Sequence, residues 1–454
     1  MTLQLSAASR SYSAYASHRV IPLASAMLAS GLSLILLLVS FSSIAEEVQV
    51  APGKGVLQTA IDAAKSGDTL ILSPGVYSGS INIHKKLTLT GSRASIIDGE
   101  GSSHVITVTA PDVVVKGLSI QHSGNTLENE DSAVFITDAG DRARIESNYL
   151  ENNLIGVYLK GPESALVNGN VIIGSQFHRM NDRGNGVYLW NTPGSIVSNN
   201  DIRYGRDGIF VNYSRNNVFH ANTLRDLRFA IHYMYTNESE VSNNISINNH
   251  VGYALMFSHH IVARENQSLG DHERGLFFNF TNYSQLVGNV VSGGAEKCVF
   301  IYNANFNEIN NNLFEDCNIG VHFTAGSESN VIHSNAFINN RTQVKYVGTR
   351  YIEWSKDGRG NYWSDNVAFD IDNNAIADQA YKPNDLVDQI VWRHPMAKLL
   401  LNSPSVQLIK WAQAEFPGIH PGGVTDSAPL MMPPYNSLKQ NKGNGKGNQE
   451  TPNG

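Results

Sequence analysis

The chain has 454 residues, of which only 16% are charged, and its formal net charge is −7. It has no basic stripe that could follow a phosphate backbone, so nucleic-acid binding is not expected.

The first segment, residues 1–45, has the order of a secretory signal. Arg10 and Arg19 lie in a polar lead, followed by the apolar run GLSLILLLVSF and by SSIA ahead of EEVQV. This order predicts cleavage after Ala45 and export from the cytoplasm. The apolar run is short for a membrane span, so no membrane insertion is expected after cleavage, although an uncleaved anchor is the alternative.

Residues 46–110 are predicted to form an N-terminal cap and the first coils of a solenoid. The stretch VLQTAIDAAKSGD has helical spacing at Leu57, Ile61 and Ala64 and stops at Gly67. A helix at this place can cover the open end of a stack of strands and protect its edge from pairing with other chains.

Residues 111–348 contain a regular repeat. Asparagines recur at intervals of 22, 30, 22, 22, 22, 23, 23 and 23 residues: Asn148, Asn170, Asn200, Asn222, Asn244, Asn266, Asn289, Asn312 and Asn335. A period of 22–23 residues is too short for two helices and fits three short strands per turn. We therefore predict an all-β, right-handed parallel β-helix in which the asparagines stack inside a bend.

Each repeat also contains a strand with period-2 alternation, such as GVYLK, GIFVN and AIHYM. Large apolar residues at alternate positions predict the core, and the intervening positions face outward. By this register His232, Met234 and Met256 lie outside the coil, with the two methionines at matching positions of adjacent strands. The other outward positions are mostly aromatic and include no acidic residue.

The two outward methionines suggest a metal site. Neighbouring strands are about 4.8 Å apart, and two sulfur ligands of one ion can be up to about 4.6 Å apart. Thioether and imidazole ligands together favour Cu(I). A second His-x-Met pair, His178 and Met180, lies in the eight-residue insertion that produces the 30-residue interval, and we expect it to serve as an additional ligand or lid. The alternative is that the methionines belong to an adaptable docking surface.

The C-terminal part is predicted to be less regular. Residues 349–435 are expected to form a cap and a partner-docking segment with a helix over 395–416, and residues 436–454 are expected to be disordered. Trp354, Trp363, Trp392 and Trp411 should be core under that cap. The two cysteines, Cys298 and Cys317, fall about four residues out of step in the repeat and are expected to be separate buried thiols.

Two rival functions follow from the same pattern. Exported β-helices are often polysaccharide-processing enzymes, but the predicted outward positions lack the pair of carboxylates that hydrolysis requires. Asp207 is placed just before its strand, and no second acid is in register with it. The aromatic face could instead bind sugar without catalysis, and a metal-free protein scaffold is a third possibility.

The series Asp370, Asp372, Asn374 and Asp378 is read as a degenerate calcium loop, in which calcium is not expected.

The C-terminal motifs GRGNYWSDN and NSPSVQLIKWAQAEFPGIHPGGVTDSAPLMMPP resemble the NosD family, whose members are periplasmic β-helical proteins needed for nitrous oxide reductase maturation. The resemblance covers nearly the whole exported chain. It implies a non-catalytic, periplasmic role in assembling copper centres, with an inner-membrane ABC transporter, a copper-chaperone lipoprotein and nitrous oxide reductase as partners. It supplies no ligand residues, so Met234, Met256, His232, His178 and Met180 remain predictions from periodicity.

Overall fold

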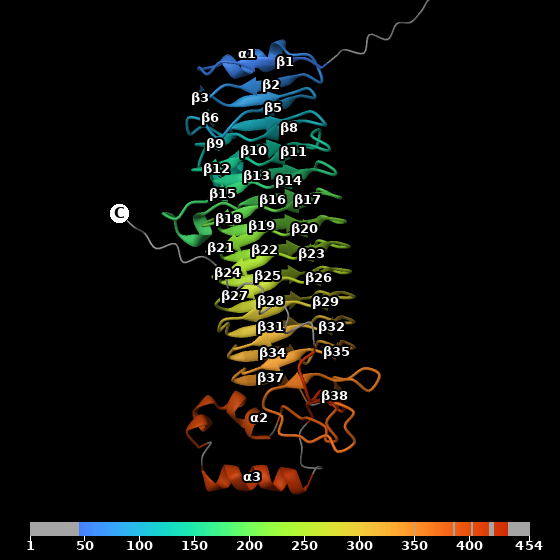
Figure 1. The fold of residues 1–454 in the computed structure, drawn as a ribbon. Coiled ribbons are helices and arrows are strands. Elements are labelled where there is room, and N and C mark those ends of the chain that lie inside the picture. The colour runs from blue at the N-terminus through green and yellow to red at the C-terminus, as the bar shows by residue number, and fades with distance from the viewer. Residues whose placement is uncertain (1–44, 349, 385, 401–402, 417–421, 435–454) are drawn as a thin grey trace, which may run out of the picture. The chain divides into compact units, whose positions relative to one another are not determined.

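The computed structural model describes residues 45–434, apart from 349, 385, 401–402 and 417–421. The predicted signal segment and the predicted disordered tail lie outside the described residues. From residue 45 onward the chain is a right-handed parallel β-helix whose coils stack along one axis (Figure 1). The fold expected from the repeat is therefore confirmed.

Three parallel sheets, named A, B and C here, form the walls of the solenoid. Within a coil the chain passes through A, then B, then C. The strands of sheet A are β1 (Glu47–Val50), β2 (Thr69–Leu72), β5 (Thr88–Thr90), β8 (Val114–Lys116), β11 (Arg144–Glu146), β14 (Leu166–Asn168), β17 (Ile196–Ser198), β20 (Val218–His220), β23 (Glu240–Ser242), β26 (Val262–Arg264), β29 (Gln285–Val287), β32 (Glu308–Asn310) and β35 (Val331–His333).

The strands of sheet B are β3 (Gly75–Ser78), β6 (Ser95–Asp98), β9 (Ser119–Gln121), β12 (Tyr149–Glu151), β15 (Val171–Ile173), β18 (Asp201–Arg203), β21 (Thr223–Arg225), β24 (Ile245–Ile247), β27 (Gln267–Leu269), β30 (Val290–Ser292), β33 (Leu313–Glu315), β36 (Ala336–Ile338) and β39 (Tyr362–Trp363).

The strands of sheet C, which carries the candidate site, are β4 (Ile81–Ile83), β7 (Ile106–Val108), β10 (Ser132–Ile136), β13 (Ile155–Lys160), β16 (Val187–Trp190), β19 (Asp207–Asn212), β22 (Phe229–Met234), β25 (Val251–Met256), β28 (Arg274–Asn279), β31 (Lys297–Tyr302), β34 (Ile319–Thr324) and β37 (Thr342–Val347). Two short 3-10 turns, η1 (Leu127–Asn129) and η2 (Met180–Asp182), lie in the loops that enter this sheet.

The predicted asparagine stack forms at the corner between sheets A and B. In each coil the side-chain amide of one asparagine donates to the side-chain oxygen of the next, for example Asn222 Nδ2 to Asn244 Oδ1 at 2.9 Å. The stack continues one coil further than predicted, because Asn335 Nδ2 donates to Asn361 Oδ1 at 2.9 Å. Each amide also satisfies backbone groups that a buried bend would otherwise leave without partners.

The N-terminal cap is as predicted. Helix α1 (Val56–Ala63) buries Leu57 and Ile61 against the first coils. Its apolar residues at i and i+4 share one face, and that face covers the end of the core.

The C-terminal cap differs from the prediction. The helix expected over 395–416 is divided into η3 (Pro395–Leu400) and α3 (Pro404–Glu415), and α2 (Leu386–Arg393) precedes them. Pro404 explains the break, because proline is tolerated only in the first turn of a helix, and Ser403 caps α3 by accepting from Val406 N. Short strands β38 (Ile352–Glu353) and β40 (Val424–Thr425) pair beyond the last coil.

Only two of the four C-terminal tryptophans are core residues. Trp354 and Trp363 are buried at the end of the solenoid, whereas Trp411 is 57% exposed on α3. The residues of the degenerate calcium loop fold into a turn whose carboxylates accept from backbone N–H groups, as in Asp370 Oδ2 with Ala375 N at 2.8 Å.

The prediction of two separate thiols is wrong. Cys298 and Cys317 form a disulfide with their Cα atoms 5.7 Å apart. Register pairs Lys297 with Ile319, so Cys317 precedes the partner position of Cys298. Cys317, however, lies in the turn between β33 and β34, and its side chain is buried against Cys298. The different positions of the two cysteines in the repeat therefore do not separate their sulfur atoms in space.

Candidate metal site on the outer face of sheet C

The outer face of sheet C carries a column of stacked rings. Rings in successive coils stack with their centroids 4.2–5.3 Å apart along the first series. From Phe135 onward these residues are partners in the register of the strands, whereas His104 precedes β7. That series is His104, Phe135, Tyr158, Tyr188, Phe210 and His232. A second series follows in the same register, Phe277, Phe300 and His322.

Ala254 is the one position between these two series and has no ring. Phe229 and Met256 both pack on the cluster of Val251, Ala254 and Phe277. The ring of Phe229 also lies 4.6 Å from the ring of His232, centroid to centroid. The break in the ring column is therefore filled from neighbouring positions by one aromatic side chain and one thioether.

These outward positions point away from the lumen, as predicted, but several are not exposed. Tyr158 is 2% exposed, Ala254 0% and Phe277 8%. Rings stacked at one-coil spacing cover the smaller side chains between them, an effect that alternation along a single strand does not reveal. The face is thus a packed surface with a few accessible atoms.

Met234 and Met256 are partners in the register of β22 and β25. Both lie at the last residue of their strand and are half-buried. They occupy neighbouring strands, which are about 4.8 Å apart in a sheet. The predicted adjacency of the two thioether side chains is therefore present in the backbone register.

His232 is oriented by a buried carboxylate. Its Nδ1 lies 3.0 Å from Oδ2 of Asp207, a residue of the adjacent strand β19 that is completely buried. Arg228 donates to both oxygens of the same carboxylate, from Nε at 2.8 Å and from Nη2 at 2.7 Å. Burial alone would raise the pKa of Asp207, but hydrogen bonds from His232 and Arg228 hold it below its usual value.

This arrangement fixes which ring nitrogen can bind a metal. An ionised carboxylate only accepts hydrogen bonds, so Nδ1 of His232 carries the proton and donates it to Asp207. The lone pair of the neutral ring is then on Nε2. A carboxylate behind an imidazole is the usual way in which proteins set the tautomer of a metal-binding histidine.

Two asparagines bracket the methionine pair. Asn212 pairs with Met234 and Asn279 pairs with Met256 in register. The side-chain Oδ1 of each is buried and has no hydrogen-bond partner among the described residues. Each of these acceptors can take a hydrogen bond from water or from a group bound beside the methionines.

The donor set fits Cu(I) better than a harder cation. Two thioethers and one imidazole nitrogen are soft or borderline ligands, and neither Mg²⁺ nor Ca²⁺ prefers them. Among the described residues there is no group of three or more His, Cys, Asp or Glu side chains that could hold a metal. A copper site on this face would thus depend on the methionines.

The other two predicted ligands lie elsewhere. His178 and Met180 are in the loop between β15 and β16, at the end of sheet C where its strands begin, whereas Met234 and Met256 end theirs. Ser175 Oγ is 2.8 Å from Nδ1 of His178, and Arg183 Nη1 is 4.0 Å from the sulfur of Met180. The structure does not bring this pair to the methionine pair.

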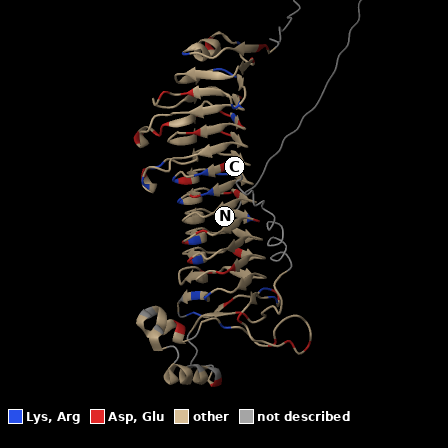
Figure 2. Cartoon of the chain, turned by 60° about the vertical axis from the view of Figure 1, so that its left-hand side comes forward, with Lys and Arg blue, Asp and Glu red and all other residues tan. Residues whose placement is uncertain are grey.

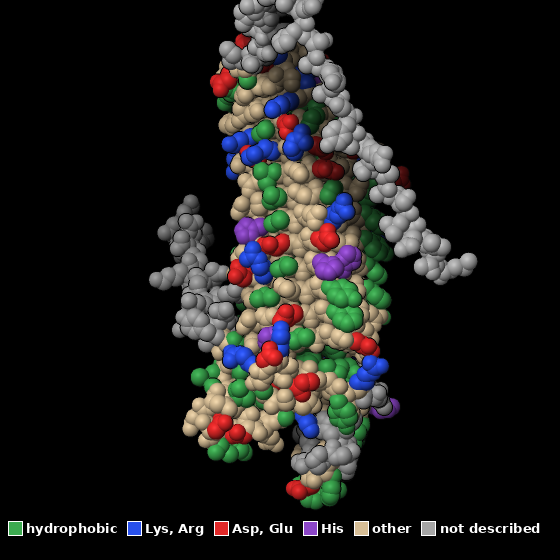
Figure 3. Space-filling view, turned by 90° about the vertical axis from the view of Figure 1, so that its right-hand side faces the viewer, with side chains coloured by type: hydrophobic (Ala, Val, Ile, Leu, Met, Phe, Trp, Pro, Cys, Tyr) green, Lys and Arg blue, Asp and Glu red, His purple; other side chains and the backbone are tan. Residues whose placement is uncertain are grey.

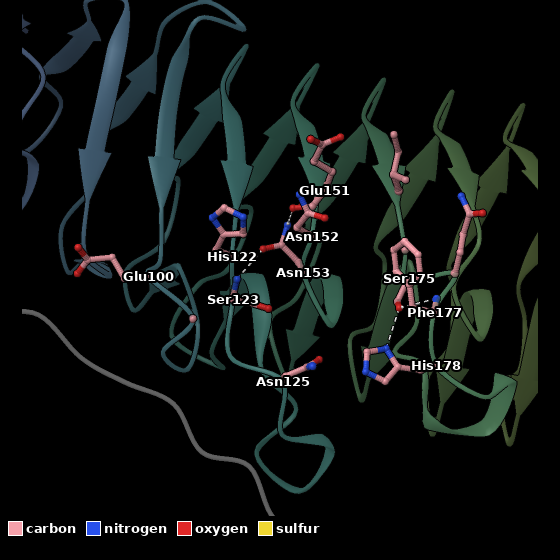
Figure 4. Close-up of a pocket in the computed structure, with 14 residues that line it drawn as sticks. Glu100, His122, Ser123, Asn125, Glu151, Asn152, Asn153, Ser175, Phe177 and His178 are labelled. Carbon is pink, nitrogen blue, oxygen red and sulfur yellow. Dashed lines mark hydrogen bonds between the residues drawn. The ribbon is translucent and has the colours of Figure 1, made fainter.

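Instead, His178 lines a hollow of about 590 Å³ together with Glu100, His122, Glu151 and the almost fully exposed Phe177. Figure 4 shows His122 and His178 on opposite sides of this hollow, each pointing into it. His122 is held by Asp98 at 2.9 Å. The loop therefore forms one wall of a separate pocket.

Sequence reasoning missed the carboxylate of this site. Asp207 was expected to precede its strand, but β19 begins with it. Its contact with His232 is diagonal, since register pairs Asp207 with Phe229. The repeat spacing of 22 residues relates only directly paired positions, so it cannot show such a contact. Asp207 begins β19, and Arg228 directly precedes β22, the strand one coil later.

Exposed rings border the methionines at the corner between sheets C and A. Tyr213, Tyr235, Phe257 and Phe280 stack in successive coils with centroids 5.0–5.2 Å apart. Figure 3 shows hydrophobic and histidine side chains side by side on this face. Acidic and basic residues are interspersed along the coils (Figure 2).

A family model and two curated relatives point to the same family. Residues 168–368 match the model of NosD, described as a periplasmic copper-binding protein. A "Probable ABC transporter binding protein NosD" of Stutzerimonas stutzeri is 38% identical over 385 residues, which cover 82% of this chain and 88% of the relative. The protein of the same description in Pseudomonas aeruginosa is 41% identical over 376 residues, covering 80% of this chain and 88% of the relative.

Solved structures share the fold. PfbA, a surface adhesin of Streptococcus pneumoniae, is 11% identical, with a TM-score of 0.51 over 64% of this chain and 88% of the adhesin. No helix in the described parts of the chain has the length and apolar character needed to cross a membrane.

Proposed function

Because the chain belongs to the NosD family, we propose that it is a non-catalytic, periplasmic copper-handling protein that binds Cu(I) on the outer face of sheet C. Met234 and Met256 supply two thioether ligands and Nε2 of His232 supplies the third. The observation that carries this proposal is the pairing of Met234 with Met256 beside a histidine whose tautomer a buried carboxylate sets.

The site is suited to passing copper on rather than keeping it. Two thioethers and one imidazole leave one coordination position of the ion open. A ligand from another protein can take that position, so the ion can move by ligand exchange. The partly exposed methionines are accessible to a donor protein. In the proposed role the ion arrives from a copper-chaperone lipoprotein and is used for the copper centres of nitrous oxide reductase.

An ABC transporter is the proposed membrane partner, in keeping with the description of the two relatives as ABC transporter binding proteins. The cap beyond the last coil is the proposed docking segment. It presents exposed apolar residues on η3 and α3, including Met396 at 76%, Leu399 at 80% and Leu408 at 62%. In this proposal, His178 and Met180 form a separate copper-binding position on their loop. They do not supply a fourth ligand to the site of Met234, Met256 and His232.

The test is a Cu(I) competition titration of the full chain against a chromogenic chelator. Met234→Leu/Met256→Leu keeps the packing on Ala254 but removes both sulfurs, and we expect a loss of at least 100-fold in affinity. Asp207→Asn should weaken binding about 10- to 100-fold by releasing the His232 tautomer. Met396→Leu, which removes an exposed thioether in the C-terminal cap, is the matched control and should bind as the unchanged chain does.

Equal affinity in the double variant and the unchanged chain would exclude these methionines. A carbohydrate-binding solenoid is the rival that the exposed rings favour. An oligosaccharide that binds the unchanged chain while Cu(I) does not would support that rival instead.

A further inference from the structure

Two adjacent histidines lie on the surface at the corner between sheets C and A. His259 and His260 follow β25 and are both exposed. Their Nδ1 atoms are 3.0 Å apart, and their rings are nearly perpendicular at 89°. Neither residue takes part in the site proposed above.

The backbone holds this pair in place. His259 N donates to Oδ1 of Asn237 in the preceding coil at 3.0 Å, and His260 N donates to the carbonyl of Asn282 in the following coil at 3.1 Å. The ring of His260 stacks on Tyr283, with centroids 5.6 Å apart and planes 15° from parallel. One imidazole is therefore fixed, while the exposed ring of His259 is free to turn toward it.

The left-handed backbone of His260 is a property of this corner in every neighbouring coil. Its φ is 56°, and the residues at the same corner of other coils, Asn216, Glu238, Tyr283 and Phe306, have φ values between 51° and 58°. Histidine is among the residue types that adopt this region more often than most. The repeated turn therefore sets the direction in which the side chain of His260 leaves the backbone.

The distance between the two Nδ1 atoms matches cis ligands of one metal ion. An ion 2.0–2.1 Å from both nitrogens, the usual metal–imidazole distance, would subtend an angle of roughly 91–97° at their 3.0 Å separation. The two nitrogens are thus close enough to bind one ion together. Among the divalent ions that imidazole ligands suit, Cu(II) binds a nitrogen and oxygen donor set most tightly.

We propose that His259 and His260 form a surface site for Cu(II), with their two Nδ1 atoms as cis ligands and water in the remaining positions. This site is independent of the Cu(I) site, because its ligands, its corner of the fold and the oxidation state of the ion all differ.

The proton balance of binding is simple. In the metal-free pair one Nδ1 carries the proton and the other accepts it. When the ion binds, that proton moves through solvent to Nε2 of its own ring, so two neutral rings release no net proton.

Electron paramagnetic resonance of the full chain with one equivalent of CuCl₂ at pH 7.5 tests the proposal. We expect an axial, tetragonal Cu(II) spectrum with nitrogen hyperfine structure from two imidazoles. His259→Gln/His260→Gln should lose that signal and at least tenfold in Cu(II) affinity. His250→Gln, at another exposed histidine, should leave both unchanged, and so should Met234→Leu/Met256→Leu.

The result that would overturn the site is an unchanged spectrum in His259→Gln/His260→Gln. The choice of ion is tested separately: Cu(II) should bind this donor set more tightly than Zn(II), so displacement of Cu(II) by ZnCl₂ at equal concentration would contradict it. Since both residues are exposed, the variant should fold, and an unchanged circular dichroism melt will verify this. Failure of this site leaves the Cu(I) titration unaffected, so the two proposals stand or fall separately.

Discussion

Single buried carboxylates show how far local environment changes the role of one residue type in this chain. Asp207 is kept ionised by an arginine and a histidine. Asp271 is equally buried, but it accepts hydrogen bonds only from neutral groups, the hydroxyls of Ser246 and Ser268 and the backbone N–H of Asn249. Burial raises the pKa of Asp271 to about 6, because no positive charge offsets the lost hydration.

The raised pKa of Asp271 makes stability depend on pH. The folded state holds this proton more tightly than the unfolded state, whose pKa is near 3.8. The free energy of unfolding should therefore fall as pH rises from about 4 to about 6, by about 3 kcal/mol in total, and level off above.

Asp271→Asn removes this dependence, since the amide oxygen can still accept from Asn249 and the serine hydroxyls can turn to accept from the amide. Urea unfolding of both chains at pH 4 and pH 7 measures the effect. We expect the variant to gain about 3 kcal/mol relative to the unchanged chain between those values. A constant difference across that range would contradict the assignment.

For single residues, the sequence predicted which side of the sheet a side chain faces better than it predicted which other side chains it contacts. Alternation placed Met234, Met256 and His232 outside the lumen, because period 2 is a property of the strand itself. It could not show that Asp207 reaches His232 or that Ala254 is covered, since both depend on side-chain lengths in neighbouring coils.

The repeated coil is the element that the sequence specifies most strongly. A buried asparagine in each turn from Asn148 onward determines both the register and the place of the bend, so the parallel β-helix could be predicted from spacing alone. The loop of residues 174–185, which contains the eight-residue insertion, shows the opposite case. Its length was visible in the 30-residue interval, but its direction was not, because a protruding loop follows contacts with residues such as Tyr204 and not the repeat.

The disulfide joins two successive coils and should stabilise them. It closes a loop with a sequence separation of 19 residues. Restricting an unfolded loop of that length is worth about 3 kcal/mol at 25 °C.

Reduction of the chain, or the variant Cys298→Ala/Cys317→Ala, should lower the free energy of unfolding by about this amount and lower Tm. Scanning calorimetry with and without a phosphine reductant measures the change, and the variant itself should be insensitive to the reductant. Equal Tm in both conditions would mean that the bond is not formed.

At the scale of the whole molecule, each end of the solenoid core is covered by a cap. Attachment of the C-terminal cap depends on Asp426. This fully buried carboxylate accepts from Asn361 N at 2.7 Å and from Trp363 Nε1 at 2.8 Å with Oδ2. It follows directly after β40, which pairs with β38. It therefore ties the cap to the last coil.

Asp426→Ala should leave at least two buried donors without an acceptor, at about 1–3 kcal/mol each. We expect the cap to open before the coils, so hydrogen exchange should rise in β38, β40 and α2 while amides near Asn244 stay protected. Glu47→Ala, at an exposed site at the other end, is the control. Uniform exchange across cap and coils would show that the chain unfolds as one unit.

The sequence indicated a cap at each end but not how the second one is attached. The N-terminal helix was predictable, because its apolar spacing is local. Asp426 lies 65 residues after Asn361, and nothing in the spacing of the chain connects them.

The stacked asparagine amides produce a net dipole along the axis of the solenoid. Every side-chain amide in it donates in the same direction, from an earlier coil toward a later one, as Asn200 does to Asn222 and Asn312 to Asn335. Aligned amide dipoles add, as they do along a helix, so the column ends in partial positive charge at Asn361. Asp426 accepts hydrogen bonds at this pole. Burial raises the pKa of its carboxyl, and the donors at the end of the column oppose that rise.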